Sequence, residues 1–399
     1  MFIYKLQQLN ICNENIFNLK FFDTTENNIY IGNSLFKYLN TTKKKIDDFP
    51  ISWSNIKKYT NEYEYIHTPL SISKQAISKI KPLSRAFFKL IEIYNYINYK
   101  NDENIKTFHL AEGPGGFIEA TNYYRNNKDD VYYGMSLTDP LDQNVPGWSK
   151  AMFFLKTNKN VKIINGKDKT GNLYSPCNFI YCVEQFKNSM EIITADGGFD
   201  FSIDFNKQEL MASRLILTEV FYAIMMQKKN GIFILKVFDT FLKISVEILY
   251  ILSCFYKDVQ ICKPKTSRMA NSEKYIICSG FKFDNSEKYF EIFKDILIDL
   301  DLPINKDKYI CSILNCKINY FFKNKIEESN AIFANKQINN ILTTIRFIEN
   351  DEKKTQKLQG IKNNNIKKCI DWCKTNNIPY NNYNNINQNE QINMFISKN

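Results

Sequence analysis

Histidine is scarce in this chain, and its cysteines do not form a metal-binding pattern. The 399 residues contain two histidines, His67 and His109, and ten cysteines without a C-x-x-C pair. A structural zinc site needs several nitrogen or sulfur ligands at characteristic spacings. We therefore expect no metal site, and we expect the scattered cysteines to be reduced, as in an intracellular protein.

Long apolar runs are also missing. No run approaches the roughly 18 apolar residues of a membrane span, and residues 1–8 lack the apolar stretch of a secretory signal. These absences predict a soluble, intracellular protein that has no membrane partner. The glycine-rich segment 113–116 is neither a G-x-G-x-x-G loop nor a Gly-Lys-Ser/Thr loop, which disfavours NAD and ATP as cofactors.

Apolar and basic residues, in contrast, are plentiful. Hydrophobic residues make up 44% of the chain and aromatic residues 15%, which is enough for a large core in one main domain with flanking segments. Lysine and arginine outnumber acidic residues by 53 to 42, and the net charge of +11 suits a polyanion such as nucleic acid. Asn, Ile and Lys abound throughout, so AT-rich codon usage is an alternative source of this charge.

Composition and apolar patterning divide the chain into four segments. The sequence shows no internal repeat. Residues 1–60 are predicted to be an N-terminal extension, and residues 61–285 an α/β domain with a mostly parallel, doubly wound sheet. Residues 286–379 are predicted to form a mainly helical C-terminal extension. The Asn-rich tail, 380–399, is expected to be disordered.

Within the α/β segment, the strands lead directly into the motifs. Thr107–Ala111 is predicted to be a strand that enters the glycine loop, and a helix is predicted from Phe117 onward. Residues 84–94 have the apolar spacing of an amphipathic helix. Further strands are expected at 131–137, 191–195, 231–236 and 274–278, with helices at 215–226 and 243–255. Most motif residues thus fall at strand ends, where α/β enzymes place their chemistry.

Four motifs carry the predicted chemistry. In chain order they are H-L-A-E-G-P-G-G-F (109–117), T-A-D-G-G-F-D (194–200), I-L-K-V-F (234–238) and S-R-M-A-N-S-E-K-Y (267–275). Glycines let a backbone turn approach a ligand closely, and a lysine between two carboxylates can be held ready for proton transfer. The series indicates a cofactor loop followed by an acid, a lysine and a second acid, in an enzyme that works on RNA.

These motifs, together with S-R-A-F-F-K-L at 84–90, resemble those of the FtsJ-type RNA 2′-O-methyltransferases over roughly residues 80–282. The likeness is greatest to the cap-specific branch, particularly the cap-2-type enzymes and their relatives in large DNA viruses. The resemblance implies a Rossmann-like fold and S-adenosylmethionine as the cofactor. It also implies a catalytic tetrad, which here would be Lys89, Asp196, Lys236 and Glu273.

In the implied mechanism, Lys236 takes the proton of a ribose 2′-hydroxyl as that oxygen attacks the methyl carbon of the sulfonium. Partial burial and a neighbouring cation, here Lys89, can bring the pKa of a catalytic lysine from ~10.4 to roughly 7–8; the two carboxylates oppose this shift, so the net effect on Lys236 depends on the geometry of the site. Lys89 would also stabilise the developing oxyanion. Asp196 and Glu273 would orient the lysines, and Asp196 would lie near the sulfonium.

The resemblance also implies a cofactor site. Its loop residues would be Glu112, Gly113, Pro114, Gly115 and Gly116. Asp168 falls where the family often places an acid near the adenine; a solvated turn is the alternative. His109 stands where bacterial members have an acid and is interpreted as a marker of the cap-specific branch.

Arg85, Trp148 and Arg268 are the predicted substrate-binding residues. Arg85 shares a helix face with Lys89. Trp148 could stack on a base or the cap guanine, and packing within its own loop is the alternative. The candidates for phosphate contacts are Lys150, Lys156, Lys263, Lys265 and Arg268. In the C-terminal extension, residues 366–373 are predicted to form an amphipathic helix that docks on the core or on a protein partner.

The sequence therefore predicts an S-adenosylmethionine-dependent RNA ribose 2′-O-methyltransferase that acts on capped mRNA. Methylation of rRNA or tRNA is an alternative, and so is a non-catalytic RNA-binding subunit that keeps the fold. The AT-rich composition and the resemblance suggest a large DNA virus as the source, with the host cytoplasm or the virion as the location.

Overall fold

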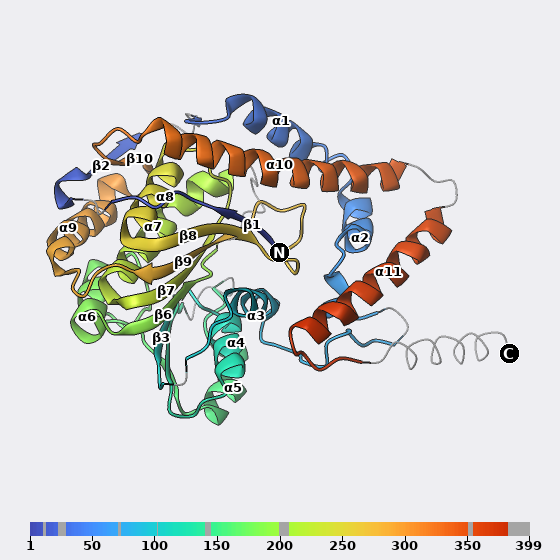
Figure 1. The fold of residues 1–399 in the computed structure, drawn as a ribbon, viewed down its shortest axis with the longest axis horizontal. Coiled ribbons are helices and arrows are strands. Elements are labelled where there is room, and N and C mark those ends of the chain that lie inside the picture. Colours follow the sequence, from blue (N-terminus) through green and yellow to red (C-terminus); the bar gives the residue numbers. More distant parts are fainter. Residues whose placement is uncertain are drawn as a thin grey trace.

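A central sheet of eight strands organises the molecule (Figure 1). The computed structural model describes residues 1–10, 13–22, 29–70, 73–101, 103–139, 145–198, 207–349 and 354–381. Residues 382–399, which make up nearly all of the predicted disordered tail, lie outside this range. The strands of the sheet, in spatial order, are β1 (Phe2–Lys5), β8 (Tyr256–Lys263), β9 (Lys274–Phe281), β7 (Gln227–Val237), β6 (Met190–Ala195), β3 (Lys106–Leu110), β4 (Val131–Met135) and β5 (Val161–Ile163).

The sheet is mostly parallel, as predicted. Strands β7, β6, β3, β4 and β5 pair in parallel, whereas β9 is antiparallel to both β7 and β8, and β1 is antiparallel to β8. The chain builds outward from β3 to β4 and β5, then returns to the other side of β3 with β6. Such a reversal opens a crevice at the carboxyl ends of the two central strands, where α/β proteins bind ligands.

Helices cover both faces of the sheet, which is why the central strands are apolar on both sides. On β6, Ile193 packs into the core formed with α6, α7 and α8, whereas Ile192 packs into the core formed with α3. The helices of the molecule are α1 (Asn33–Lys44), α2 (Pro50–Thr60), α3 (Ala86–Ile97), α4 (Gly116–Arg125), α5 (Met152–Thr157), α6 (Pro176–Phe186), α7 (Gln208–Met226), α8 (Lys243–Phe255), α9 (Phe290–Asp301), α10 (Tyr320–Glu349) and α11 (Lys354–Thr375). Among the described helices, none is both long enough and apolar enough to span a membrane.

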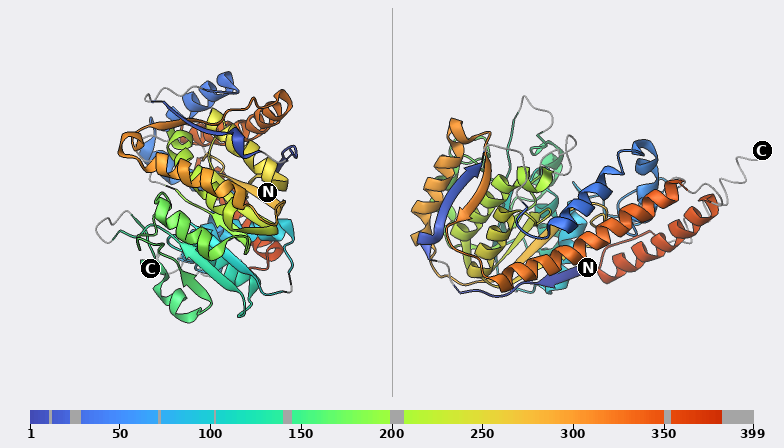
Figure 2. Two further views of the ribbon diagram at one scale, coloured as in Figure 1. Left: turned by 90° about the vertical axis from the view of Figure 1, so that its left-hand side faces the viewer. Right: turned by 90° about the horizontal axis from the view of Figure 1, so that it is seen from above.

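The first 60 residues do not form a unit of their own. β1 is an edge strand of the main sheet, and β2 (Phe17–Phe22) pairs with β10 (Tyr309–Leu314) in a separate two-stranded sheet. α1 and α2 pack against the long helix α10. Helices α2, α10 and α11 extend to one side of the sheet in Figures 1 and 2. The two predicted extensions are therefore interlocked with each other and with the α/β domain.

The helix predicted at 366–373 exists as the second half of α11 and docks on the core. Cys369, Trp372 and Cys373 are buried there in the same core as α3. The ring of Trp372 meets that of Phe88 edge-on, and its Nε1 donates a hydrogen bond of 3.2 Å to Oε2 of Glu92. The apolar face of this helix is therefore used within the chain, and a protein partner of the extension stays a prediction.

Candidate active site

The glycine loop closes the carboxyl end of β3 and begins α4. Oε1 of Glu112 accepts hydrogen bonds from the backbone N–H groups of Phe117 (2.7 Å) and Ile118 (2.8 Å), which would otherwise lack partners in the first turn of the helix. Burial raises the pKa of Glu112 well above its ordinary value despite these bonds. Its Oε2 is buried without a partner among the described residues, which marks a place where a bound molecule would complete the hydrogen bonding.

The glycines are needed because the loop backbone packs against other backbone and side-chain atoms. A Cβ atom on Gly113 would lie 2.7 Å from the backbone oxygen of Gly147, and one on Gly116 would lie 2.1 Å from Oγ of Ser84. Gly115 has a φ of +113°, in the region that favours glycine. The loop is therefore held in one shape, next to the first turn of α3.

The structure brings the four residues of the expected tetrad together from four segments. Nζ of Lys89, on α3, lies 2.7 Å from Oε1 of Glu273, which precedes β9. Nζ of Lys236, on β7, lies 3.3 Å from Oδ1 of Asp196 and donates a hydrogen bond of 2.6 Å to its backbone oxygen, at the end of β6. All four side chains are largely buried, with at most 16% of any of them exposed.

Tyr275 joins the two ion pairs, and sequence reasoning did not identify it as a site residue. Its hydroxyl donates a hydrogen bond of 2.8 Å to Oδ1 of Asp196 and accepts one of 3.3 Å from Nζ of Lys89. Residues two apart on a strand lie on the same face of the sheet. Tyr275 follows Glu273 by two positions, so the motif itself contained the signal that could have found it.

The charges around Lys236 decide the direction of its pKa shift. Burial lowers the pKa of this lysine, but the carboxyl groups of Asp196, Glu273 and Glu219 outweigh that effect and raise its pKa above 10.5. Glu219, on α7, was not identified from the sequence. Burial raises the pKa of Glu219 itself to about 8. The pKa of Lys236 in the protein alone is thus not in the range of roughly 7–8, because the nearby carboxyl groups stabilise the ammonium.

Glu273 is held by a second layer of contacts. Oγ of Ser267 donates a hydrogen bond of 2.8 Å to its Oε1. Burial disfavours the ionised carboxylate, yet Lys89 and Lys236 keep the pKa of Glu273 well below its ordinary value. Beneath it, Nζ of Lys263 donates to the backbone oxygens of Asn271 and Glu273, each at 2.7 Å, and to Oδ1 of Asn271 at 2.8 Å. Lys263 is buried, so the expectation that it contacts phosphate is wrong.

Asp168 lies beyond the end of β5 in a structured turn. Its Oδ1 accepts hydrogen bonds from the backbone N–H and the hydroxyl of Thr170 and from Nδ2 of Asn178. Although burial acts in the opposite direction, these bonds lower the pKa of Asp168 to about 2. The carboxylate is therefore ionised near neutral pH, and the role near an adenine stays a prediction.

Trp148 is not placed to stack on a base. Only 9% of its surface is exposed, and its ring packs against Gly134, where a Cβ atom would lie 2.7 Å from Cη2 of the indole. Ile118 and Ala151 belong to the same cluster. The alternative from the sequence, packing within its own loop, does not describe these contacts either, because the ring packs against β4 and α4. The expected substrate contact is wrong because Gly134 leaves room for the indole inside the core.

The two predicted substrate arginines differ in their contacts. The guanidinium of Arg268 donates from Nε and Nη2 to the two carboxylate oxygens of Glu64, so its charge is already neutralised. Arg85, at the N-cap of α3, makes no hydrogen bond or ion pair through its side chain with the described residues. His109 is buried between Thr107 and Thr194, and burial lowers its pKa to about 3, so it is neutral.

Comparisons with known proteins agree with this geometry. The profile of the family described as FtsJ-like methyltransferase matches residues 82–281. Cap-specific mRNA (nucleoside-2′-O-)-methyltransferase 2 of Drosophila melanogaster is 29% identical over 265 residues, which cover 62% of this chain and 37% of the relative. Cap-specific mRNA (nucleoside-2′-O-)-methyltransferase 1 of Mus musculus is 27% identical over 251 residues, which cover 60% and 29%.

The chain thus matches only about a third of the length of these relatives. Among solved structures, a protein from Plasmodium falciparum described as a ribosomal RNA methyltransferase aligns with a TM-score of 0.35 and 20% identity. That alignment covers 50% of this chain and 97% of the other.

Proposed function

Because the chain belongs to the FtsJ-like methyltransferase family, we propose that it is an S-adenosylmethionine-dependent RNA ribose 2′-O-methyltransferase that acts on the cap region of mRNA. The observation that carries this proposal is the buried network Glu273–Lys89–Tyr275–Asp196–Lys236 at the carboxyl edge of the sheet. The names of the relatives from fly and mouse support capped mRNA as the substrate.

The residues at this edge suit S-adenosylmethionine. The cofactor is cationic at its sulfonium and its amine, and acidic side chains stand at the ends of three strands: Glu112 after β3, Asp168 after β5 and Asp196 after β6. The buried, unpartnered Oε2 of Glu112 calls for a hydrogen-bond partner. We assign the Glu112–Gly116 loop, Asp168 and Asp196 to cofactor binding on this basis.

Lys236 is the residue that would take the proton of the ribose 2′-hydroxyl. Bound S-adenosylmethionine supplies an activated methyl group and a positive charge. The pKa of Lys236 falls when another positive charge enters this cluster, because that charge offsets the carboxylates that hold the proton on the lysine. A larger fraction of the amine is then neutral, and this neutral form can accept the hydroxyl proton as the oxygen becomes a nucleophile.

The remaining members of the network hold the charges in place. Glu273 fixes the ammonium of Lys89, which stabilises negative charge that develops on the ribose oxygen. Asp196 keeps Lys236 oriented through its backbone oxygen and its carboxylate. Tyr275, through one hydroxyl, sets the separation of the two pairs. Arg85 is assigned to a phosphate of the RNA, because its charge has no partner among the described residues.

The test is methyl transfer from labelled S-adenosylmethionine to capped and uncapped forms of one RNA. Wild type is compared with Lys236→Ala and with Lys229→Ala, a change at an exposed lysine of the same strand. We expect cap-dependent transfer by wild type and by Lys229→Ala, and none by Lys236→Ala.

Equal methyl transfer to the capped and the uncapped RNA would support the alternative, in which the substrate is rRNA or tRNA. Absence of both transfer and S-adenosylmethionine binding in wild type would favour the non-catalytic subunit. A protein partner, the cytoplasmic or virion location and a viral source stay predictions.

A further inference from the structure

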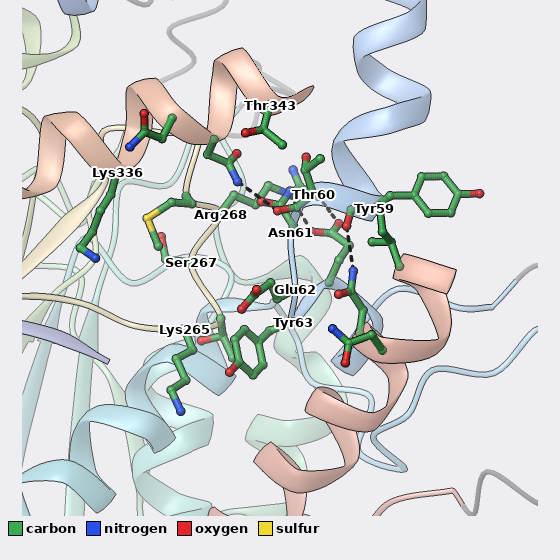
Figure 3. A pocket seen from close by; sticks show the side chains of 18 of the residues that line it. Tyr59, Thr60, Asn61, Glu62, Tyr63, Lys265, Ser267, Arg268, Lys336 and Thr343 are labelled. Atoms are coloured by element: carbon green, nitrogen blue, oxygen red, sulfur yellow. Dashed lines mark hydrogen bonds and ion pairs between the residues drawn. The ribbon is translucent and has the colours of Figure 1, made fainter. Parts of the chain in front are cut away.

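We propose that a pocket built by the two extensions binds an unpaired nucleotide of the RNA, next in the chain to the nucleotide that is methylated. This inference rests on the proposed function and adds a second contact for the same substrate. The pocket has a volume of about 620 Å³ and lies among the N-terminus, residues 59–64, residues 265–269, α10 and α11 (Figure 3). We call it the extension pocket. Its volume is in the range of small-ligand sites and exceeds the space that one nucleotide needs.

The extension pocket shares a wall with the tetrad. Ser267 lines the pocket, and its Oγ donates a hydrogen bond of 2.8 Å to Oε1 of Glu273. Arg268 and Glu64, which hold each other, line the pocket beside it. Ser267 therefore contacts both the pocket and one carboxylate of the tetrad. Because consecutive nucleotides are covalently linked, an RNA whose ribose is held at Lys236 would bring its neighbour to this wall.

The lining offers the three kinds of contact that a nucleotide uses. Tyr59 and Tyr63 are partly exposed rings against which a base can stack. Lys265 and Lys336 supply positive charge for phosphate. Amide groups, which can both donate to and accept from base edges, come from Asn61, Asn339, Asn340, Asn364 and Asn365.

The charges in the pocket favour an anion. Of the two acids in the lining, Glu64 is held by Arg268 and Glu62 is paired with Lys368, with 2.6 Å between Nζ and Oε1. Lys265 and Lys336 have no ion pair with the described residues. Each instead lies near an aromatic ring, with Nζ of Lys265 5.7 Å from the ring centroid of Tyr63 and Nζ of Lys336 3.6 Å from that of Phe2. The uncompensated charge in the lining is therefore positive.

Two amide oxygens in the lining also lack partners among the described residues. Oδ1 of Asn61 and Oδ1 of Asn340 are buried without a hydrogen bond within the described residues. Buried polar atoms of this kind call for an explanation, and a ligand with donor groups is one. Most of the lining, including residues 59–64 and the two helices, lies outside residues 82–281, so the pocket is an addition to the family domain.

The experiment uses the full chain and measures RNA binding separately from catalysis. The pocket variant is Lys265→Ala/Lys336→Ala, and the control is Lys294→Ala/Lys325→Ala, which removes the same charge from partly exposed, ion-paired positions on α9 and α10 outside the pocket. Affinity is measured by fluorescence anisotropy at several salt concentrations, for a capped single-stranded 12-mer and for the capped dinucleotide m7GpppG, which has no nucleotide beyond the first transcribed one. KM and kcat for methyl transfer are measured with the 12-mer.

We expect the pocket variant to weaken binding of the 12-mer and to raise its KM about tenfold, with kcat nearly unchanged. The slope of log Kd against log salt should fall by about 0.7 for each lysine removed. The capped dinucleotide should bind both variants like wild type. Tyr63→Leu should weaken binding of the 12-mer without changing the salt slope, because a stacking ring carries no charge.

Unchanged Kd and KM in the pocket variant would overturn the proposal, and so would an equal loss in the control. Displacement of the 12-mer from the pocket by a free mononucleotide at similar affinity would assign the site to a free nucleotide and overturn the RNA assignment. If wild type binds RNA through the two lysines but transfers no methyl group, the proposed function fails while the pocket stands. If wild type and the Lys265→Ala/Lys336→Ala variant transfer methyl groups with the same KM, the proposed function stands and the pocket proposal fails.

Discussion

Replacement of Tyr275 by phenylalanine tests whether the network acts as one unit. The substitution keeps the buried ring but removes the hydroxyl that donates to Asp196 at 2.8 Å and accepts from Lys89 at 3.3 Å. Neither charged partner loses its ion pair, since Lys89 keeps Glu273 and Asp196 keeps Lys236. The change therefore removes the connection between the two pairs and leaves each pair intact.

The size of the effect follows from these contacts. A hydrogen bond to a charged group contributes about 1.5–3 kcal/mol, and two such bonds share this hydroxyl. If loss of these bonds raises the activation free energy by about 2 kcal/mol, kcat should fall about 30-fold. Binding of S-adenosylmethionine should change little, because the Glu112–Gly116 loop and Asp168 are untouched.

The assay is single-turnover methyl transfer at saturating RNA and cofactor, with calorimetric binding of S-adenosylmethionine as the second readout. Tyr256→Phe is the matched control, because Tyr256 is equally buried in the same sheet and its hydroxyl donates to Gln227 at 3.1 Å, outside the network. A rate for Tyr275→Phe within twofold of wild type, or an equal loss in Tyr256→Phe, would refute the idea that the tyrosine sets the separation of the pairs.

Four further predictions follow from the same geometry. Because only the neutral amine accepts a proton and the pKa of Lys236 is raised, log(kcat/KM) should rise by about one unit per pH unit between about pH 7 and 9; a plateau in that range would contradict this. Gly113→Ala should weaken S-adenosylmethionine binding about tenfold through the clash with the backbone of Gly147, whereas Gly360→Ala, with nothing within 4 Å, should leave it unchanged in the same calorimetric titration. Trp148→Phe should lower the free energy of unfolding by about 2 kcal/mol in urea denaturation and leave the Kd for RNA unaltered. Lys263→Met should lower the free energy of unfolding by about 3 kcal/mol and reduce kcat, because it removes three hydrogen bonds beneath Glu273. A variant with the stability and rate of wild type would contradict the view that Lys263 supports Glu273.

The local pattern of apolar residues was enough to predict the helices and strands in the central part of the fold. The helix predicted at 243–255 is α8 to the residue, and the strand predicted at 191–195 is β6 with one more residue at its start. These segments are mostly apolar, so the spacing of their apolar residues and their lengths define them without knowledge of their neighbours. The tetrad could be selected because five motifs, one of which is the 84–90 segment with Lys89, occur in the order of a known family.

Long-range pairing was not predictable in the same way. β2 pairs with β10 across almost 300 residues, and β1 pairs with β8 across about 250 residues. Nothing local in the short segment Phe2–Lys5 specifies its partner. Whether Trp148 or Lys263 is buried likewise depends on space left by other segments, such as the gap at Gly134. The direction of the pKa shift of Lys236 depends on how the fold brings Asp196, Glu273 and also Glu219 of α7 near its ammonium.

The burial of two ion pairs at this edge is itself an argument for chemistry. Removing charged groups from water is costly, and replacing a buried ion pair with apolar residues of similar volume often leaves stability equal or raises it by about 1–4 kcal/mol. Lys89, Glu273, Lys236 and Asp196 are at most 16% exposed, at a place where the surrounding strands and helices already provide an apolar core. Stability alone therefore does not explain them. A reaction that moves a proton from a hydroxyl and creates negative charge on its oxygen needs opposite charges preorganised in a dry site. Such a reaction explains the two buried ion pairs.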